Sequence, residues 1–325
     1  MTTNRDMTAA ELTARAVVLQ EPRQLALREL ALTPPTVADC VVDIAYSGIS
    51  TGTERLLWDG RMPAFPGLAY PLVPGYESVG RVAAVGDGCD LAVGQRVFVP
   101  GSRGYTDVQG LFGGAADRLV VDATRVTPLD DTLGEEAALL ALAATALRAV
   151  TRGPEGVLPD LVIGHGVLGR LVARVVLALG GDAPTVWERD AGRRAGADGY
   201  PVIDPASETR RDYRLICDVS GAVGLLDTLV AHLAPGGCIV LAGFYQEPVS
   251  FTFPPAFMRE AQLRISAEWQ QEDLEAVVKL VAEGRLELDG LITHRQPAAH
   301  AAPAYRQAFG DSECLKMILD WRSVQ

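Results

Sequence analysis

Two kinds of hydrophobic pattern divide the chain, and the change falls near residue 135. Before it, short stretches that alternate apolar and polar residues are separated by Gly, Pro and Asp, as at 16–19 and 40–45. Such short, punctuated stretches predict the strands of a small β-barrel. After it, four apolar runs predict strands at 161–164, 184–188, 214–219 and 238–243. Because helical patterns alternate with these runs, we expect a parallel sheet and a chain of the α/β class.

The segments between these strands complete the outline. In the first part we predict a polar, glycine-broken turn at 47–54 and an aromatic, proline-rich loop at 58–70. Helices are predicted at 135–150, at 223–233 with Gly236-Gly237 closing it, and at 272–283 with Gly284 as its C-cap. The span 191–214 holds no long helical pattern, so the α/β unit is expected to be abbreviated. The end of the chain, 315–319, is predicted to be a final strand.

The strongest chemical signal is the pattern Gly164-x-Gly166-x-x-Gly169, placed between a predicted strand and a helical pattern. In this context glycines let the backbone approach a pyrophosphate, and the free N–H groups at the helix start bind its charge. The residues predicted to bind the cofactor here are Gly164, His165, Gly166, Val167, Leu168 and Gly169. His165 either approaches the phosphates or is simply a residue of the turn.

Glu188 ends the next predicted strand, 24 residues after Gly164, where an acidic side chain binds the ribose of a dinucleotide. Its charge would repel a 2′-phosphate and favours NAD over NADP. Arg189 and its neighbouring arginines leave this choice open, because arginine can hold that phosphate. Ligands bind at the carboxyl ends of parallel strands; the residues expected there are Asp218, Ser220, Gly243 and Phe244. Thr145 either contacts the nicotinamide or lies inside its own helix.

Composition is typical of a globular enzyme. The chain has 325 residues, enough for two domains, and is 48% hydrophobic and 22% charged. The formal net charge of −12 argues against nucleic acid and anionic membrane surfaces as partners. The N-terminal segment lacks the apolar core of a signal peptide, and the longest apolar stretch, 137–147, is too short to span a membrane. The five cysteines have no paired spacing, which indicates reduced thiols in the cytoplasm.

Taken in order, the motifs resemble those of the medium-chain dehydrogenase/reductase superfamily. The stretches that carry the resemblance are Gly48-Ile49-Ser50, Pro74-Gly75-Tyr76-Glu77, the glycine motif, and the tail segments 289–295 and 316–319. The resemblance implies three parts: a GroES-like β-barrel catalytic domain at 1–135, a doubly wound parallel-sheet (Rossmann) NAD-binding domain at 136–270, and a segment at 271–325 that returns to the catalytic domain. It also implies a homodimer formed through the sheet edge near 249–265.

The stretches 47–58 with 60–62, and 162–170, resemble the bacteriochlorophyllide a dehydrogenase family in particular. That family oxidises the 3-(1-hydroxyethyl) group of a chlorin or bacteriochlorin to acetyl, using NAD. The resemblance implies a tetrapyrrole substrate, which needs an open apolar cleft. The candidate lining residues are Trp58, Met62, Phe65 and Tyr70, with Arg55 or Arg61 as the partner of the pigment's propionate. The alternative is that the apolar residues are core and the arginines only face solvent.

The zinc-dependent members of the superfamily differ from this chain at their metal ligands. They carry Cys where Ser50 stands and His where Tyr76 stands, and their third ligand falls near 140–143, which is apolar here. Tetrahedral zinc needs three N, S or O donors. The cysteine-rich lobe that holds structural zinc is replaced by the glycine-rich segment 101–114. We therefore predict no zinc at either site.

Without zinc, side chains must stabilise the developing alkoxide and take up the proton. The hypothesis is that the Tyr76 phenol or the Ser50 hydroxyl hydrogen-bonds the substrate oxygen, while Glu77 or Thr53 orients it or relays the proton. Alternatively, Tyr76 only fills the space of the missing His and zinc, and Glu77 is structural.

Three functions remain open at this point. The leading one is an NAD-dependent, zinc-independent dehydrogenase acting on a hydroxyethyl pigment. A zinc-less NADPH quinone or enoyl reductase of the same superfamily is the first rival, and cofactor preference separates the two. A catalytically silent NAD(H)-binding sensor is the second rival, which binding of NADH without turnover would favour.

Overall fold

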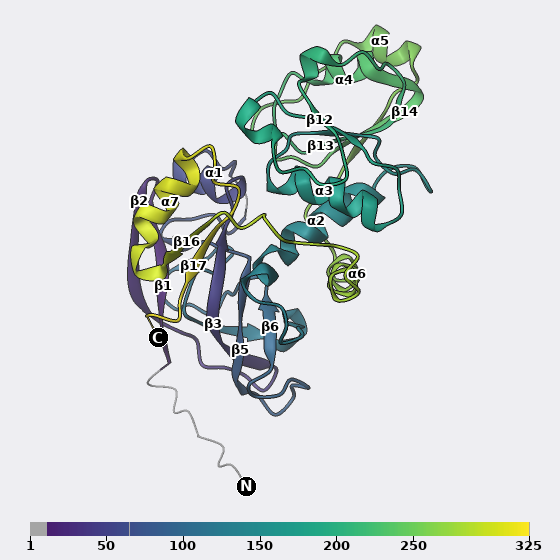
Figure 1. Ribbon diagram of the computed structural model, residues 1–325. Coiled ribbons are helices and arrows are strands. Elements are labelled where there is room, and N and C mark those ends of the chain that lie inside the picture. Colours follow the sequence, from purple (N-terminus) through teal and green to yellow (C-terminus); the bar gives the residue numbers. More distant parts are fainter. Residues whose placement is uncertain (1–11, 65, 325) are drawn as a thin grey trace. The chain divides into compact units, whose positions relative to one another are not determined.

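The computed structural model describes residues 12–64 and 66–324, and their contacts divide the chain into two compact units (Figure 1). The first unit comprises 1–139 and 292–325, and the second comprises 140–291. The predicted boundaries at 135 and 270 therefore shift to 139 and 291. The larger shift arises because helix α6 (Gln271–Ala282) packs against α2 (Leu140–Thr151) inside the second unit.

Two sheets build the first unit. The smaller sheet has the order β2-β1-β4-β7, with strands Gln24–Ala31, Thr13–Glu21, Leu72–Val73 and Gln109–Gly110. The larger sheet has the order β16-β17-β3-β5-β6-β9, with strands His294–Pro297, Met317–Asp320, Asp39–Ile49, Ser78–Val85, Arg96–Val99 and Thr127–Pro128. Strand β8 (Arg118–Asp122) also pairs with β3. The apolar positions of both sheets meet in one core, so the alternating sequence pattern is explained.

The turn predicted at 47–54 is wrong for residues 47–49, which are strand, and for residues 53–54, which are helix. Strand β3 runs to Ile49 because β17 pairs with it antiparallel, from Met317 opposite Ile49 to Asp320 opposite Tyr46. This partner lies at the far end of the chain, where a local pattern cannot reveal it. Helix α1 (Thr53–Asp59) then begins after a short turn and occupies part of the predicted loop at 58–70.

The C-terminal segment completes the first unit. Helix α7 (Ala301–Gly310) packs against β2, β16 and β17 (Figure 1). After β17, the buried indole of Trp321 donates a hydrogen bond to the Ser47 hydroxyl at 2.8 Å. The returning segment is therefore part of the hydrophobic core of this unit and not an appendage.

The second unit is a six-stranded, wholly parallel sheet of order β12-β11-β10-β13-β14-β15. Its strands are Val202–Ile203, Thr185–Trp187, Leu161–Ile163, Tyr213–Asp218, Leu233–Leu241 and Gln262–Ile265. Helices α2 and α3 (Val167–Ala178) lie on one face, and α4 (Leu226–His232) and α5 (Phe253–Met258) lie on the other (Figure 1). This strand order is that of a doubly wound dinucleotide-binding sheet, as predicted.

Local details of this sheet differ from the sequence outline in two places. Strand β14 begins at Leu233, so Gly236-Gly237 lies inside it and does not close the preceding helix, which ends at His232. The predicted helix at 135–150 begins as a 3-10 turn over Glu135–Leu139. As predicted, 191–214 contains only 3-10 turns (Ala191–Arg194 and Pro205–Ser207), β12 and the first residues of β13.

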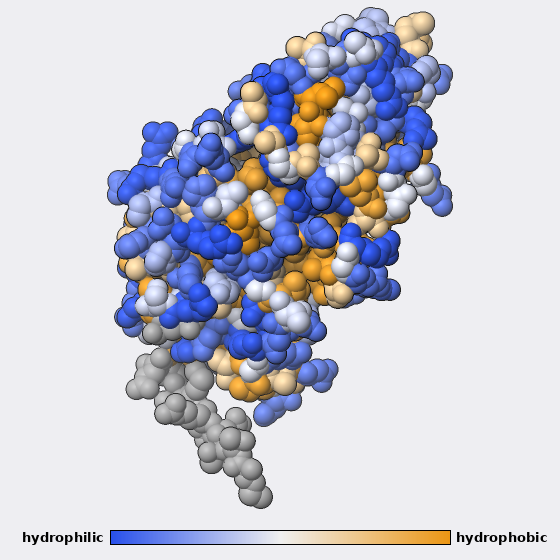
Figure 2. All heavy atoms as spheres, in the orientation of Figure 1, coloured by the Kyte–Doolittle hydropathy of each residue, from blue (hydrophilic) through white to orange (hydrophobic). Residues whose placement is uncertain are grey.

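Hydrophilic side chains cover most of the face drawn in Figure 2, in keeping with the charge of the chain. Of the helices described, none is both long enough and apolar enough to cross a membrane.

Candidate functional site

Three hydroxyl groups gather in the first unit where β3 ends and α1 begins. The Tyr76 hydroxyl donates to the Ser50 Oγ at 2.7 Å. Thr53, the first residue of α1, also hydrogen-bonds the Tyr76 phenol. The sequence analysis selected these residues from two motifs, Ser50 and Thr53 from 47–54 and Tyr76 from 74–77, and the structure brings them together.

The Tyr76 side chain is held in a protonated form. Its ring meets the Phe112 ring edge-on, with centroids 5.1 Å apart. Burial, followed by the negative charge of Glu77, raises the pKa of the phenol above its ordinary value. The Tyr76 hydroxyl is therefore a hydrogen-bond donor at neutral pH, not a ready base.

Glu77, the residue after Tyr76, forms a buried ion pair with Lys316. The Lys316 ammonium donates to Glu77 Oε2 at 2.5 Å and to the Ile49 carbonyl at 3.3 Å. Oε1 of Glu77 has no partner among the described residues. Burial raises the pKa of Glu77, and the charge of Lys316 opposes that rise. A Cβ at Gly48 would lie 2.0 Å from Oε2, so the chain needs glycine beside this carboxylate.

A second buried carboxyl, Glu54, lies next to the same turn. Its Oε1 accepts the Ser50 backbone N–H at 3.1 Å and its Oε2 accepts the Tyr305 hydroxyl at 2.6 Å. Burial raises the pKa of Glu54 to about 7, although both hydrogen bonds act in the opposite direction. Glu54 and Lys316 lie in the stretches 47–54 and 316–319, but the sequence indicates no role for either, because the side chains they bind, Tyr305 and Glu77, lie more than 200 residues away.

The donor set of this cluster is poorly suited to zinc. Ser50 and Tyr76 offer hydroxyl oxygens, and burial disfavours the oxyanion that would bind a metal strongly. Within 12–64 and 66–324, no three side chains of His, Cys, Asp or Glu gather closely enough to hold a metal ion.

The candidate substrate residues lie around a small apolar cluster. Trp58, Met62 and Tyr70 are partly buried against Leu57, and the Tyr70 hydroxyl donates to the Leu57 carbonyl at 2.5 Å. The Trp58 ring also lies 6.1 Å from that of Phe309. Phe65 lies outside the described residues. These side chains are neither fully buried core nor fully exposed surface, so they offer apolar area at the molecular surface.

Arg55 belongs to a group of three arginines around one carboxylate at the end of α1. Asp59 pairs with Arg61 at 3.1 Å, with Arg23 at 3.3 Å and with Arg55 at 3.9 Å. All three guanidinium groups are at least half exposed. One carboxylate cannot neutralise three cations, so this end of α1 carries an excess of positive charge.

The second unit carries the glycine motif in the expected strand–turn–helix setting. Gly164 follows β10 and Gly166 is the N-cap of α3, which begins at Val167 and continues through Leu168. A Cβ on Gly169 would lie 1.9 Å from the Gly164 carbonyl oxygen. Only glycine allows the helix to start this close to the strand end, which leaves the helix N-terminus open to an anion.

Glu188, which follows the neighbouring strand β11, hydrogen-bonds this turn. One carboxylate oxygen accepts the His165 backbone N–H at 3.1 Å, and the other accepts the Asp190 N–H at 2.9 Å. Arg189 is exposed, whereas Arg194 is already bound to the Glu188 carbonyl and to the Asp204 carboxylate. Of Glu188, Arg189 and Arg194, it is therefore the acid whose side chain hydrogen-bonds the glycine turn.

Of the remaining cofactor candidates, Asp218, Ser220, Gly243 and Phe244 lie at or just after the ends of β13 and β14, and Thr145 lies inside α2. Asp218 ends β13, and its carboxylate accepts both the N–H and the hydroxyl of Ser220. A Cβ on Gly243 would meet the Gly221 nitrogen at 2.6 Å, and Phe244 is 52% exposed. The Thr145 hydroxyl donates to the Ala141 carbonyl, as a threonine inside a helix does.

His165 has a structural environment that its sequence position did not reveal. The ring is buried, with Nδ1 2.6 Å from the Arg193 carbonyl and Nε2 3.0 Å from the Tyr200 hydroxyl. Burial lowers the pKa of His165, so the ring is neutral near pH 7. Arg170, also missed, donates to the His165 carbonyl and to three carbonyls of residues 193–196. These bonds tie the glycine turn to the segment after Glu188.

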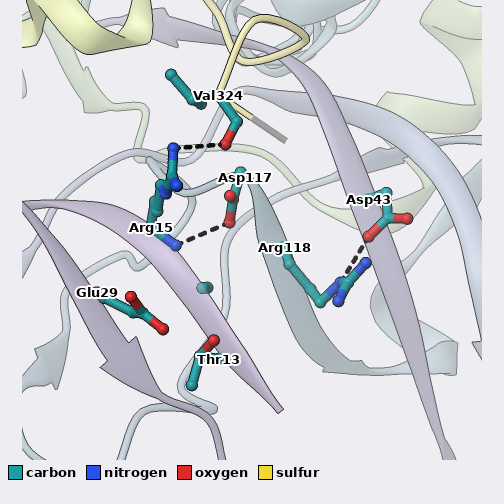
Figure 3. A pocket seen from close by; sticks show the side chains of 8 residues that line it. Thr13, Arg15, Glu29, Asp43, Asp117, Arg118 and Val324 are labelled. Carbon is teal, nitrogen blue, oxygen red and sulfur yellow. Dashed lines mark hydrogen bonds and ion pairs between the residues drawn. The ribbon is translucent and has the colours of Figure 1, made fainter. Parts of the chain in front are cut away.

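A charged hollow of about 280 Å³ on the first unit is a separate feature (Figure 3). Arg118 pairs with Asp43, and Arg15 binds the Asp117 carboxylate through its N–H and the Val324 carbonyl through its side chain. Its arginines are thus engaged within the protein, and we assign it a structural role in holding the end of the chain.

This chain is similar to a known domain family and to two enzymes of the same name. A model of the alcohol dehydrogenase GroES-like domain matches residues 37–131. The 2-desacetyl-2-hydroxyethyl bacteriochlorophyllide A dehydrogenase of Rhodobacter capsulatus is 55% identical over 312 residues, which cover 96% of this chain and 99% of that protein. The enzyme of the same name from Cereibacter sphaeroides is 56% identical, over 95% of this chain and 98% of that one.

Solved structures agree on the fold. A short chain alcohol dehydrogenase from E. coli CFT073, complexed with NADH, superposes with a TM-score of 0.82 at 23% identity, covering 95% of this chain and 99% of its own. A dehydrogenase from Sinorhizobium meliloti 1021, bound to NADP, superposes with a TM-score of 0.80 at 19% sequence identity. The superposition covers 96% of this chain and 100% of that one. At these identities the likeness establishes the fold, and it confirms the predicted barrel and Rossmann architecture.

Proposed function

Because this chain belongs to the family of bacteriochlorophyllide a dehydrogenases, we propose that it oxidises the 3-(1-hydroxyethyl) group of a chlorophyllide or bacteriochlorophyllide to acetyl. The proposal includes NAD as the oxidant and no catalytic zinc. The observation that carries it is the identity of 55% over 96% of the chain to an enzyme named for this pigment.

The second unit would hold the cofactor. The start of α3 presents N–H groups to the pyrophosphate, and Glu188 accepts hydrogen bonds from the ribose hydroxyls. When bound, NAD accepts the hydride from the carbinol carbon. The negative charge of Glu188 beside the turn favours NAD over NADP, whose 2′-phosphate it would repel.

The hydroxyl cluster of the first unit would handle the substrate oxygen. Tyr76 donates to Ser50, which leaves the Ser50 O–H free to donate to the oxygen as negative charge develops there. The substrate's hydroxyl proton passes to Ser50 as Ser50 passes its own proton to Tyr76, Tyr76 passes its proton to Thr53, and Thr53, which is partly exposed, releases one to water. After this relay Tyr76 donates to Ser50, and Ser50 donates to the alkoxide. Glu77, engaged with Lys316, holds the Tyr76 segment in place.

No step in this scheme uses zinc. Ser50 and Tyr76 occupy the positions where the zinc-dependent members carry metal ligands, and burial keeps the Tyr76 phenol protonated. Stabilisation of the alkoxide by fixed hydroxyl dipoles replaces the Lewis acid.

The apolar cluster at the surface would receive the macrocycle. Trp58, Met62 and Tyr70 offer flat and flexible apolar contacts beside α1. The excess of positive charge around Asp59, to which Arg55 contributes, would attract the propionate carboxylate of the pigment.

Other features support a homodimer and a cytoplasmic compartment. Strand β15 is an edge of the parallel sheet, and exposed Phe253, Phe257, Met258 and Ile265 lie on it and on α5. We assign this apolar edge to a homodimer contact.

All five cysteines are free thiols, which supports a reducing, cytoplasmic compartment.

The decisive experiment incubates the pure protein with NAD and a 3-hydroxyethyl chlorophyllide. We expect the visible absorption band to shift as the acetyl group enters conjugation, with NADH formed in equal amount. Turnover with NADPH on a quinone or enoyl substrate instead, or tight NADH binding without oxidation of any pigment, would overturn the proposal in favour of a reductase or a silent sensor.

A further inference from the structure

Glu54 is a buried carboxyl that the proposed chemistry does not use. It is 1% exposed and lies in the first turn of α1. Placing a carboxyl in a protein interior is costly unless hydrogen bonds compensate. Both of its oxygens accept such bonds, one from the Ser50 N–H and one from the Tyr305 hydroxyl.

The Ser50 backbone N–H lies just beyond the end of the strand pairing and is bound by Glu54 instead of by a neighbouring strand. The pairing of β3 with β17 ends at Ile49, opposite Met317. The next N–H along the chain, that of Ser50, is instead taken by Glu54 Oε1 at 3.1 Å. Glu54 therefore fixes the main chain at the residue whose hydroxyl binds Tyr76.

Tyr305 fixes Glu54 in turn. Its side chain is buried on α7, and its ring packs edge-on against Phe309 with centroids 5.7 Å apart. The Tyr305 hydroxyl donates to Glu54 Oε2 at 2.6 Å, and this hydrogen bond sets the orientation of the carboxyl group. A continuous chain of hydrogen bonds thus runs from α7 through Glu54 and the Ser50 main chain to the Tyr76 hydroxyl.

We propose that Glu54 is a positioning residue, which holds the Ser50–Tyr76 hydroxyl pair in the geometry that receives the substrate oxygen. It acts through the Ser50 main chain and does not touch the reacting atoms. The kinetic part of this inference rests on the proposed function. Displacement of a catalytic group by roughly 1 Å can cost on the order of 100-fold in rate, so the effect should be measurable.

Two substitutions separate positioning from simple burial. Glu54→Gln keeps a carbonyl oxygen for the Ser50 N–H and offers its amide group to the Tyr305 oxygen, which can accept. Glu54→Leu keeps the bulk and removes both bonds. We expect Glu54→Leu to lower kcat at least about tenfold with the pigment KM within about twofold, and Glu54→Gln to stay within about threefold of wild type. A kcat for folded Glu54→Leu within about threefold of wild type would overturn the proposal.

A second readout requires no substrate. Exchange of the Ser50 amide hydrogen with solvent should be at least about tenfold faster in Glu54→Leu and unchanged in Glu54→Gln. If wild type fails to oxidise the pigment, the proposed function fails while this measurement still tests the positioning role. Equal Ser50 exchange in wild type and Glu54→Leu would contradict that role.

Tyr305→Phe is the variant to use if Glu54→Leu does not fold. It removes one hydroxyl, keeps the ring packing, and should lower kcat about threefold or more while speeding Ser50 exchange. The matched control is Tyr105→Phe, which removes another buried hydroxyl of the first unit, bound to the Gly113 carbonyl at 2.7 Å. We expect the control to leave both readouts unchanged; identical behaviour of the two variants would overturn the inference.

Discussion

The Lys316 ammonium lies 2.5 Å from the Glu77 carboxylate, and both side chains are buried in the first unit. Lys316 directly precedes β17 and Glu77 directly precedes β5. This one ion pair therefore connects the end of the chain to the residue that follows Tyr76.

Removal of the cation should destabilise the fold. Lys316→Met leaves Glu77 buried without a counter-charge, a change that typically costs about 3–5 kcal/mol. We expect this loss in the free energy of unfolding at pH 8 by urea denaturation, and a smaller loss at acid pH, where Glu77 is protonated. Lys279→Met is the control, because Lys279 is 75% exposed and its pair with Glu283 should contribute less than about 1 kcal/mol. Equal effects of the two substitutions would argue against the buried pair.

Glu54 should make stability depend on pH. Its pKa in the folded protein, about 7, lies above its ordinary value of 4.5, so the native state binds the proton more tightly than the unfolded chain. Its stabilising contribution is complete below about pH 4.5 and is lost as the pH rises through about 7. The difference in unfolding free energy between wild type and Glu54→Gln should therefore fall by up to about 3 kcal/mol from pH 4.5 to pH 8. A difference that does not change with pH would contradict a raised pKa.

Tyr76→Phe tests the hydroxyl pair. We expect kcat to fall about tenfold or more, equivalent to about 1.4 kcal/mol of barrier, because Ser50 loses its donor. Affinity for NADH, measured by calorimetry, should not change. Tyr46→Phe, at a half-buried tyrosine of β3, should keep the wild-type rate. Turnover of Tyr76→Phe within about threefold of wild type would show that Tyr76 only fills space.

Glu188→Gln tests the choice of cofactor. Neutralising this side chain removes the repulsion of a 2′-phosphate, so the ratio of kcat/KM for NAD to that for NADP should fall about tenfold or more. Steady-state kinetics with both cofactors measures the ratio. Glu155→Gln, an exposed change in the same unit, should leave it constant. A wild type that prefers NADP would reverse the assignment.

Ile265→Lys tests the proposed dimer contact. This residue is 63% exposed on edge strand β15, and a charge there should block pairing with a second copy. Sedimentation should show wild type as a dimer and the variant as a monomer. Val37→Lys, a 67% exposed apolar position of the first unit, should remain dimeric. A monomeric wild type would exclude the contact.

The parallel sheet was predictable because its signals are local. A buried run, the turn at Gly164–Gly169 and an amphipathic helix follow one another within 20 residues. Because the hydrogen bonds of a turn and a helix join residues close in sequence, the local pattern is enough to predict them. The end of β3 was not predictable in the same way, since residues 47–49 become strand only through pairing with β17. The start of β14 likewise depends on its partner strand, because Tyr213 pairs with Leu233.

The amino-acid sequence alone determined the family, the glycine turn with its acid at Glu188, and the hydroxyl side chains at positions 50 and 76. Only the tertiary structure showed that Glu54 binds Tyr305 and that Glu77 binds Lys316, contacts separated by 251 and 239 residues. The physical reason is that burial and pairing set the charge state and orientation of a carboxyl. Both depend on side chains that the chain brings together only when it folds.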